Sequence, residues 1–283
     1  MLNWNVFPGI NMIRSEIHES KYRPHFTGHE TFPLKYGWLK KAYDEIVFCN
    51  SEEEGKSVFL NDEAISRFGV GKNMVASIKH WASTAKVIKN NEITSIWEPT
   101  PLGNLIFNDV DPFMENPSTL WLIHWNLASN PFRTTWFWVF NHFPGIQFDR
   151  EILLSNLIAL SEKQGWKKTS EATIKRDVEC FTRTYASRIK TSKISNEEAL
   201  ESPLTELGII RSTGKKDGFR FVKGNKPTLK DGVFTYALID YWIKNFKESN
   251  SLSFEAITYQ PGSIGKVFLL DENSMVHRLV NWK

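Results

Sequence analysis

The apolar spacing of residues 72–85 most constrains how this chain folds. Six apolar side chains recur at intervals that place them on one face of a helix: Met74, Val75, Ile78, Trp81, Ala82 and Ala85. The break Gly69-Val70-Gly71 precedes this stretch, and glycine permits a tight turn after a short helix that begins near residue 61. Two short strands are expected at residues 87–88 and 93–96. Helix, tight turn, helix and hairpin together predict a winged helix-turn-helix module.

The opposite face of the predicted helix over residues 72–85 is polar. Its side chains that can donate to phosphates or base edges are Lys72, Asn73, Lys79 and His80. The short side chains of Ala76 and Ser83 would let the backbone approach a duplex closely. This face therefore predicts contact with double-stranded DNA. The alternative is that the module serves for dimerisation or as a scaffold.

A second informative stretch runs from residue 26 to residue 41. Gly28 favours a turn in which the adjacent His29 and Glu30 act together. There His29 is a candidate general base, and Glu30 a candidate metal ligand or orienting group. Lys35 and Lys40, further along, are candidate phosphate contacts. In the alternative interpretation this segment docks on the core, and His29 and Glu30 satisfy buried backbone groups.

Basic charge is concentrated in the second half of the chain. Residues 163–193 carry nine Lys or Arg and three Asp or Glu, a net +6, whereas the whole chain carries +3. A surface that follows a phosphate backbone requires such a concentration. The candidate DNA contacts are Lys167, Lys168, Lys175, Arg176 and Arg183, with Lys215 at the tip of a second expected hairpin. The alternative is a solvated helix with lysine-rich ends.

Hydrolysis of a phosphodiester requires an activated water, neutralisation of phosphate charge and help for the leaving group, which metal nucleases supply with carboxylates around Mg²⁺. No familiar nuclease signature is present. Asp177 is a candidate catalytic residue that would pair with a base or hold a metal, and an intrahelical ion pair with Arg176 is the alternative. Asp111 joins Glu30 as a candidate ligand for Mg²⁺ or Mn²⁺, and helix capping is its alternative role. No organic cofactor is expected.

Composition bounds the class of protein. The two cysteines, Cys49 and Cys180, form no CxxC, so a reducing cytoplasm is the expected location. No signal peptide is visible, and no apolar run approaches the ~20 residues that a membrane helix needs. An aromatic-rich centre over residues 109–143 ends at Pro144-Gly145, which predicts two domains, 1–145 and 146–283. The expected fold is mainly α with small β-hairpins (α+β): winged helix-turn-helix modules joined by an aromatic helical core.

Several segments resemble one bacterial family. They are residues 25–41, 68–81, 101–103, 120–125, 175–178, and 261–262 with 267–271, so the resemblance covers nearly the whole chain. Residues 263–265 stand as an insertion within the last of these motifs. The family was long catalogued without a function. Its members, the SspB-like proteins, occur in DNA phosphorothioation defence clusters beside a phosphoadenosine-phosphosulfate-reductase-like protein.

The resemblance implies a DNA nickase that helps to install sulfur on the DNA backbone, linked to defence against phage. It also implies partners: a cysteine desulfurase, an ATPase and an ATP-pyrophosphatase-type sulfur transferase. It transfers no catalytic residue to this chain. Two alternatives stay open, a non-catalytic DNA-binding adaptor that recruits the sulfur-transfer proteins and a transcription regulator.

Overall fold

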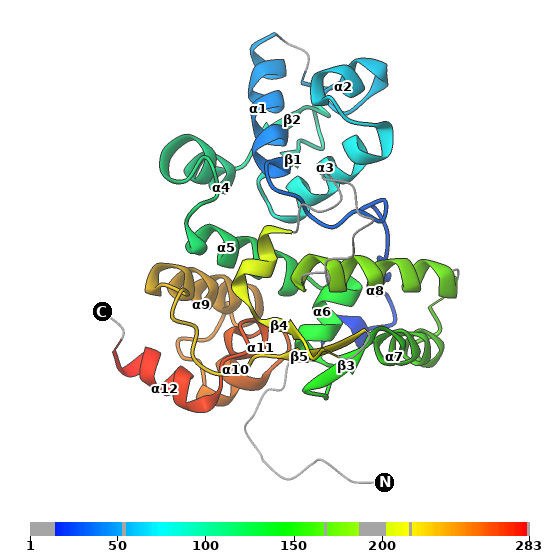
Figure 1. Cartoon of the computed structure of the whole chain (residues 1–283). Coiled ribbons are helices and arrows are strands. Elements are labelled where there is room, and N and C mark those ends of the chain that lie inside the picture. Colours follow the sequence, from blue (N-terminus) through cyan, green and yellow to red (C-terminus); the bar gives the residue numbers. More distant parts are fainter. Residues whose placement is uncertain (1–14, 53–54, 167–168, 187–201, 215–216, 282–283) are drawn as a thin grey trace.

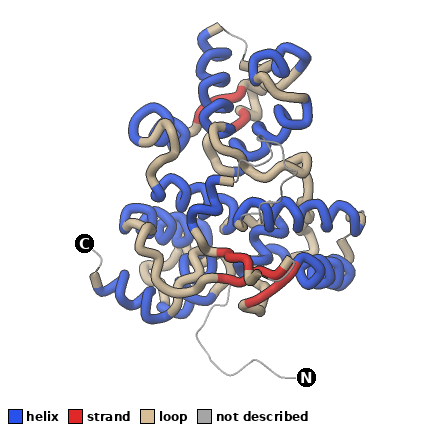
Figure 2. Tube along the Cα trace, viewed as in Figure 1, coloured by secondary structure: helices blue, strands red, loops and turns tan. Residues whose placement is uncertain are grey.

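The computed structural model describes residues 15–52, 55–166, 169–186, 202–214 and 217–281. It is mixed α+β, with two small antiparallel sheets among many helices (Figures 1 and 2). The α+β class expected from the sequence is confirmed at this level. Within the described residues, no helix has the length and apolar character to cross a membrane.

The first half begins with a helical module, at the top of Figure 1. Its elements are α1 (Trp38–Ser51), α2 (Asn61–Phe68), α3 (Lys72–Thr84), β1 (Ile88–Asn90) and β2 (Trp97–Pro99). The short turn η1 (Glu16–His18) precedes them in the chain but lies outside the module, where His18 contacts His142 and Gln164. The order α2, glycine turn, α3 and hairpin is the one the sequence predicts, and whether the module acts as a winged helix stays a prediction. The predicted apolar stripe of α3 is packed inward, with Val75, Ile78, Trp81 and Ala82 buried.

Two boundaries differ from the sequence expectation. The side-chain pattern of residues 33–47 predicts a helix over that whole range. The first long helix begins instead at Trp38, because Gly37 adopts φ 77°, which an α-helix cannot contain. The second strand of the hairpin begins at Trp97, not at residue 93. Asn91 Oδ1 accepts from the backbone N–H of Ile93 and Thr94, so these residues form the turn and the strand starts later.

The centre of the molecule is aromatic. The elements that lead into it and form it are α4 (Pro101–Asn104), the π-helical turn η2 (Leu105–Val110), α5 (Pro117–Ala128) and α6 (Thr134–Asn141). Trp121, Trp125, Trp136 and Trp138 are all buried on α5 and α6. Helix α6 packs on α8 and α11, and α5 packs on α9, so this centre connects both halves of the chain. The expected domain boundary near residue 145 stays a prediction.

The second half encloses the other side of this centre. Its elements are β3 (Gln147–Asp149), α7 (Arg150–Lys163), α8 (Glu171–Tyr185), η3 (Pro203–Leu207), β4 (Ile210–Ser212), β5 (Gly218–Phe221), α9 (Asp231–Asn245), α10 (Phe254–Tyr259), α11 (Ile264–Val267) and α12 (Glu272–Val280). The second expected hairpin forms from β4 and β5. It also pairs with β3, in the order β3-β5-β4. This third strand was not expected from the sequence, because its partner β5 lies about seventy residues further along the chain and no short turn connects the two strands.

Candidate nucleic-acid interface

The segment 25–31, here called the motif loop, packs closely against α3 in an unusual backbone conformation. Gly28 has φ 101°, and Glu30 and Thr31 adopt φ 46° and 67°. A Cβ at position 28 would lie 2.3 Å from His80 Nδ1, so only glycine fits this approach to α3. Two consecutive non-glycine residues in the left-handed region persist only where the surroundings hold them. The loop is therefore fixed by its contacts and not by its own preference.

Those contacts begin with His29, which is 3% exposed. Its Nδ1 accepts from the backbone N–H of Thr31 at 3.0 Å, so Nε2 carries the proton and donates to Asp177 Oδ1 at 2.7 Å. Ser77 Oγ on α3 donates to the carbonyl of His29 at 3.0 Å. His29 thus ties the motif loop to α3 and α8, and both of its ring nitrogens are engaged.

Asp177 lies on the buried face of α8 and is 3% exposed. The sequence left open an intrahelical pair with Arg176, but Asp177 points inward to His29 while Arg176 is exposed. Its second oxygen, Oδ2, is buried and has no hydrogen-bond partner among the described residues. A buried carboxylate oxygen without a partner is unfavourable. Packing alone does not explain why a carboxylate stands at this buried position.

Arg133, at the N-cap of α6, is a buried cation on which the charge of Asp177 acts. Burial lowers the pKa of Arg133 from its ordinary value, and the charge of Asp177 opposes that shift. Arg133 Nη1 lies 3.3 Å from His25 Nδ1 and 3.2 Å from His80 Nε2. Its Nε is buried without a partner among the described residues. Arg133 therefore sits between two imidazoles with part of its donor capacity unused.

The two imidazoles beside Arg133 are held neutral near pH 7. Burial lowers the pKa of His80 well below its ordinary value, and Arg133 lowers it further. Burial and then Arg133 lower the pKa of His25 in the same direction. Neutral imidazoles can accept a proton, and a guanidinium can bind a phosphate oxygen. This combination suits the chemistry of a phosphodiester.

These groups line one cleft of about 640 Å³, here called the α3 cleft. The motif loop contributes His25, Gly28 and Glu30, and α2 contributes Asp62, Ala64 and Ile65. The remaining lining is Phe59, Lys72, Val75, Ala76, Lys79, His80, Ser83, Thr84 and Arg133. Most of the polar face of α3 that the sequence singled out therefore faces this cleft. The motif loop forms its opposite wall.

The predicted site residues fall into three groups. Glu30, Lys72, Lys79 and His80 line the α3 cleft, and Asn73 is exposed on the first turn of α3. His29, Asp177 and Arg183 lie behind the motif loop, where Arg183 Nη1 donates to the carbonyl of Thr31 at 3.2 Å. Others lie away from the cleft lining: Lys35 packs over Phe32 and Trp38, Lys40 pairs with Asp44, and Lys175 and Arg176 are exposed on α8.

Three further expectations fall on residues 167, 168 and 215. Lys167, Lys168 and Lys215 lie outside the residues that the structure describes. Conversely, sequence reasoning missed His25 and Arg133 as members of the site. The only local signal for Arg133 is its place after the turn Asn130-Pro131, in a polar break between two aromatic helices. Nothing local indicates that this break faces α3.

The expected metal ligands differ in what they can bind. Mg²⁺ takes one or two carboxylates together with waters and substrate phosphates. Glu30 and Asp62 are exposed carboxylates lining the α3 cleft, so their chemistry fits an ion shared with a bound phosphate. Asp111 is 7% exposed, and both of its carboxylate oxygens accept hydrogen bonds, from the N–H of Glu115 and Asn116 and from Thr119 Oγ1. It therefore stabilises the turn that precedes α5 and has little capacity left to bind a metal. Across the described residues, no three His, Cys, Asp or Glu side chains group in a way that could hold a metal.

Comparison with known proteins identifies relatives of this chain. The magnesium ion-bound SspB crystal structure superposes with a TM-score of 0.79 at 27% sequence identity, covering 94% of this chain and 80% of that one. A second SspB crystal structure superposes with a TM-score of 0.78 at 26% identity over the same shares. No curated protein matches. A family model described as a protein of unknown function, DUF4007, matches residues 26–283. The chain therefore belongs to the DUF4007 family and is SspB-like in sequence and fold.

Proposed function

We propose that this protein binds double-stranded DNA at the α3 cleft and nicks one strand during backbone phosphorothioation in an Ssp-type defence system. The observation that carries the proposal is the convergence of α3 and the motif loop on one cleft. That cleft presents Lys72, Lys79 and Arg133 beside neutral imidazoles. Cationic side chains position a phosphate backbone, and neutral imidazoles can move protons next to it.

In this proposal the module of α2, α3 and the β1–β2 hairpin docks as a winged helix. The side chains of Ala76 and Ser83 are short, so that a phosphate backbone can approach His80 closely along the middle of α3. Lys79 Nζ lies 5.2 Å from the ring centroid of Trp97 on β2, which places its charge between helix and hairpin. Lys72 and Asn73 extend the contact at the first turn of α3, where backbone N–H groups also favour anions.

The residues of the site take different roles. Arg133 binds a non-bridging phosphate oxygen, and His80 or His25 accepts a proton from the attacking water. Glu30, with Asp62, would hold Mg²⁺ or Mn²⁺, which when bound polarises the phosphate and lowers the pKa of a coordinated water. His29 and Asp177 are positioning residues, because their mutual bond holds the motif loop in its strained shape. The cysteine desulfurase, ATPase and sulfur transferase implied by the sequence resemblance would then act at the nicked backbone.

A plasmid-relaxation assay tests the enzyme. Supercoiled plasmid with Mg²⁺ or Mn²⁺ should become open circle with the wild-type protein and with Glu179→Gln, a matched exposed glutamate on α8. Glu30→Gln and His80→Gln should each slow nicking by at least about tenfold while circular dichroism stays unchanged. Equal rates for Glu30→Gln and Glu179→Gln would remove Glu30 from the site. Intact plasmid with pure wild-type protein would end the nickase proposal.

A DNA-binding adaptor is the second candidate. The closed His29–Asp177 pair favours it, because a histidine with both nitrogens engaged and 3% exposure fixes a surface without reacting on it. The adaptor predicts salt-sensitive duplex binding without nicking. It also predicts unchanged phosphorothioate content in cells that carry Glu30→Gln. Mass spectrometry of digested genomic DNA measures that content and separates the two candidates.

A further inference from the structure

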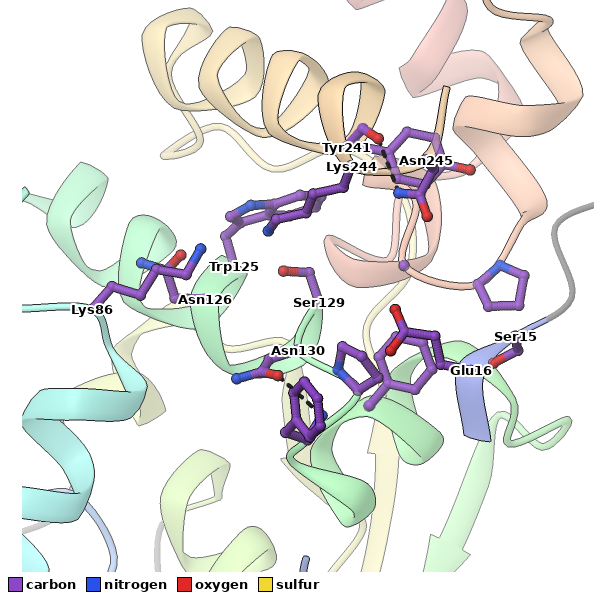
Figure 3. A pocket seen from close by; sticks show the side chains of 15 residues that line it. Ser15, Glu16, Lys86, Trp125, Asn126, Ser129, Asn130, Tyr241, Lys244 and Asn245 are labelled. Atoms are coloured by element: carbon purple, nitrogen blue, oxygen red, sulfur yellow. Dashed lines mark hydrogen bonds between the residues drawn. The ribbon is translucent and has the colours of Figure 1, made fainter. Parts of the chain in front are cut away.

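A second pocket, of about 350 Å³, lies between α5, α9 and the N-terminal turn η1 (Figure 3). Its walls include Lys86, Trp125, Asn126, Ser129 and Asn130 on one side, and Tyr241, Lys244 and Asn245 on α9. It shares no lining residue with the α3 cleft. Its volume is within the range of small-molecule sites and far too small for a duplex.

One end of this pocket holds an excess positive charge. Burial lowers the pKa of Lys86, and repulsion by the neighbouring Lys244 lowers it further. Asp240 is the fixed anion here: its Oδ2 contacts Lys244 Nζ and accepts from Trp125 Nε1 at 2.8 Å. Two ammonium groups against one carboxylate leave an excess of one positive charge at this end of the pocket. Lys86 also adopts φ 58°, an unfavourable backbone conformation for lysine that persists only where the surrounding structure holds it.

The other end of the pocket holds an excess negative charge. Figure 3 shows Glu16 across the pocket from Lys86. Burial raises the pKa of Glu16, and the charge of Glu19 raises it further, while Lys21 and Lys244 oppose the shift. Lys21 already pairs with Glu19, at 3.4 Å. One negative charge therefore remains at this end.

The wall between the two ends offers hydrogen bonds and apolar surface. Asn126 is fully buried, and its Nδ2 donates to the carbonyl of Ala85 at 3.0 Å. Its Oδ1 has no partner among the described residues, so it is an unused acceptor in the pocket wall. Phe132 and Phe137 add apolar area. The pocket thus separates opposite charges across a short, partly apolar interior.

We propose that this pocket binds a small zwitterion, with a carboxylate or phosphate against Lys86 and Lys244 and an amine against Glu16. Each end of such a ligand would neutralise a charge that the fold leaves unbalanced. An N–H or O–H near the anionic end would satisfy Asn126 Oδ1. A simple anion or a simple amine would neutralise the charge at only one end of the pocket. The charged side chain at the other end would then be shielded from water without a partner.

The test uses the whole protein and the indole N–H of Trp125, whose NMR signal reports on this pocket because the group donates to Asp240. The probes are gamma-aminobutyrate and phosphoethanolamine, which carry the two anion types. Butyrate, inorganic phosphate and butylamine are the single-charge controls. We expect both zwitterions, or one of them, to shift the signal and to bind at least about tenfold more tightly than the controls.

Two variants locate the charges. Lys86→Asn removes the ammonium and suits the left-handed backbone, and Glu16→Gln removes the carboxylate. Each should weaken zwitterion binding by about tenfold. Lys89→Asn, an exposed lysine on β1 outside this pocket, should not change it. The proposal is overturned if no zwitterion shifts the Trp125 signal, if butyrate or phosphate binds as tightly as the zwitterions, or if Lys86→Asn and Glu16→Gln bind like Lys89→Asn.

Discussion

Two regions of this protein are built around a buried histidine, and they differ in the hydrogen bonding of the polar groups around it. In the core, His124 on α5 is fully buried, and both ring nitrogens are engaged, by Tyr185 OH and by the carbonyl of Val267, each at 2.8 Å. Behind the motif loop, His29 is engaged in the same way, but Asp177 Oδ2 beside it and Nε of Arg133 in the cleft lining keep no partner among the described residues.

The difference separates a structural role from a functional one. A satisfied buried histidine stabilises a packed centre and is neutral. Unsatisfied charged groups beside an open cleft destabilise the folded protein, so their retention points to a ligand that completes them. The predictions below probe this contrast, beginning with the largest expected effect.

Removing the carboxylate that fixes the motif loop should have the largest effect. Asp177→Ala leaves the Nε2 proton of a buried, neutral histidine without an acceptor, and an unsatisfied buried donor of this kind destabilises by up to about 3 kcal/mol. Urea unfolding at neutral pH measures this change. Glu179→Ala, on the exposed face of the same helix, should stay within about 0.5 kcal/mol of wild type. Similar values for the two variants would show that the pair does not hold the loop.

Acid should destabilise the protein through the core histidine. Burial lowers the pKa of His124 to about 4, whereas the unfolded chain titrates at about 6.5. Because the unfolded state binds the proton at higher pH, this stabilisation is complete above about pH 6.5 and is lost as the pH falls towards 4. The difference between the pKa values corresponds to about 3 kcal/mol.

His124→Gln isolates that contribution. Glutamine can donate to Val267 and accept from Tyr185 but does not titrate, so the fall in unfolding free energy over this pH range should become shallower. The exposed His277→Gln on α12 is the matched control and should keep the wild-type slope. An unchanged slope in His124→Gln would assign the acid sensitivity to other groups, such as His142, whose pKa burial lowers to about 3.

At the cleft, a cation should affect binding more than folding. Arg133→Gln should weaken duplex binding by about tenfold and reduce the salt slope by about one phosphate contact. Fluorescence anisotropy of a labelled duplex at several salt concentrations gives both numbers. Arg220→Gln, an exposed arginine on β5, should leave both unchanged. If Arg133→Gln and Arg220→Gln behave alike, the α3 cleft is not the DNA surface.

The smallest effect is expected on α8. Lys175→Ala with Arg176→Ala removes two exposed charges outside the α3 cleft, so it should weaken binding by only about threefold and flatten the salt slope. The double variant Lys223→Ala with Lys230→Ala removes the same charge from other exposed positions and is the control. A loss greater than that of Arg133→Gln would move the main DNA contact from the cleft to α8.

Much of the fold was predictable because it follows local rules. The stripe of α3 follows from side-chain periodicity, its glycine turn from the residues at 69–71, and the aromatic centre from the local composition of residues 109–143. Strand β3 was not predictable, since three residues acquire strand structure only by pairing with β5. For the site, the sequence singled out His29, Glu30 and Asp177 but gave no geometry linking the first to the last, which lie 148 residues apart.

The sequence by itself determined helix α3, its polar and apolar faces, and the turn at Gly28, because these depend on neighbours within a few positions. Only the tertiary structure decided that Asp177 turns inward to His29, that Arg133 joins His25 and His80, and that Lys86 lies across a pocket from Glu16. The physical reason is that desolvation and Coulomb interactions act through space. A residue's charge state and availability are therefore set by groups that are distant in the chain.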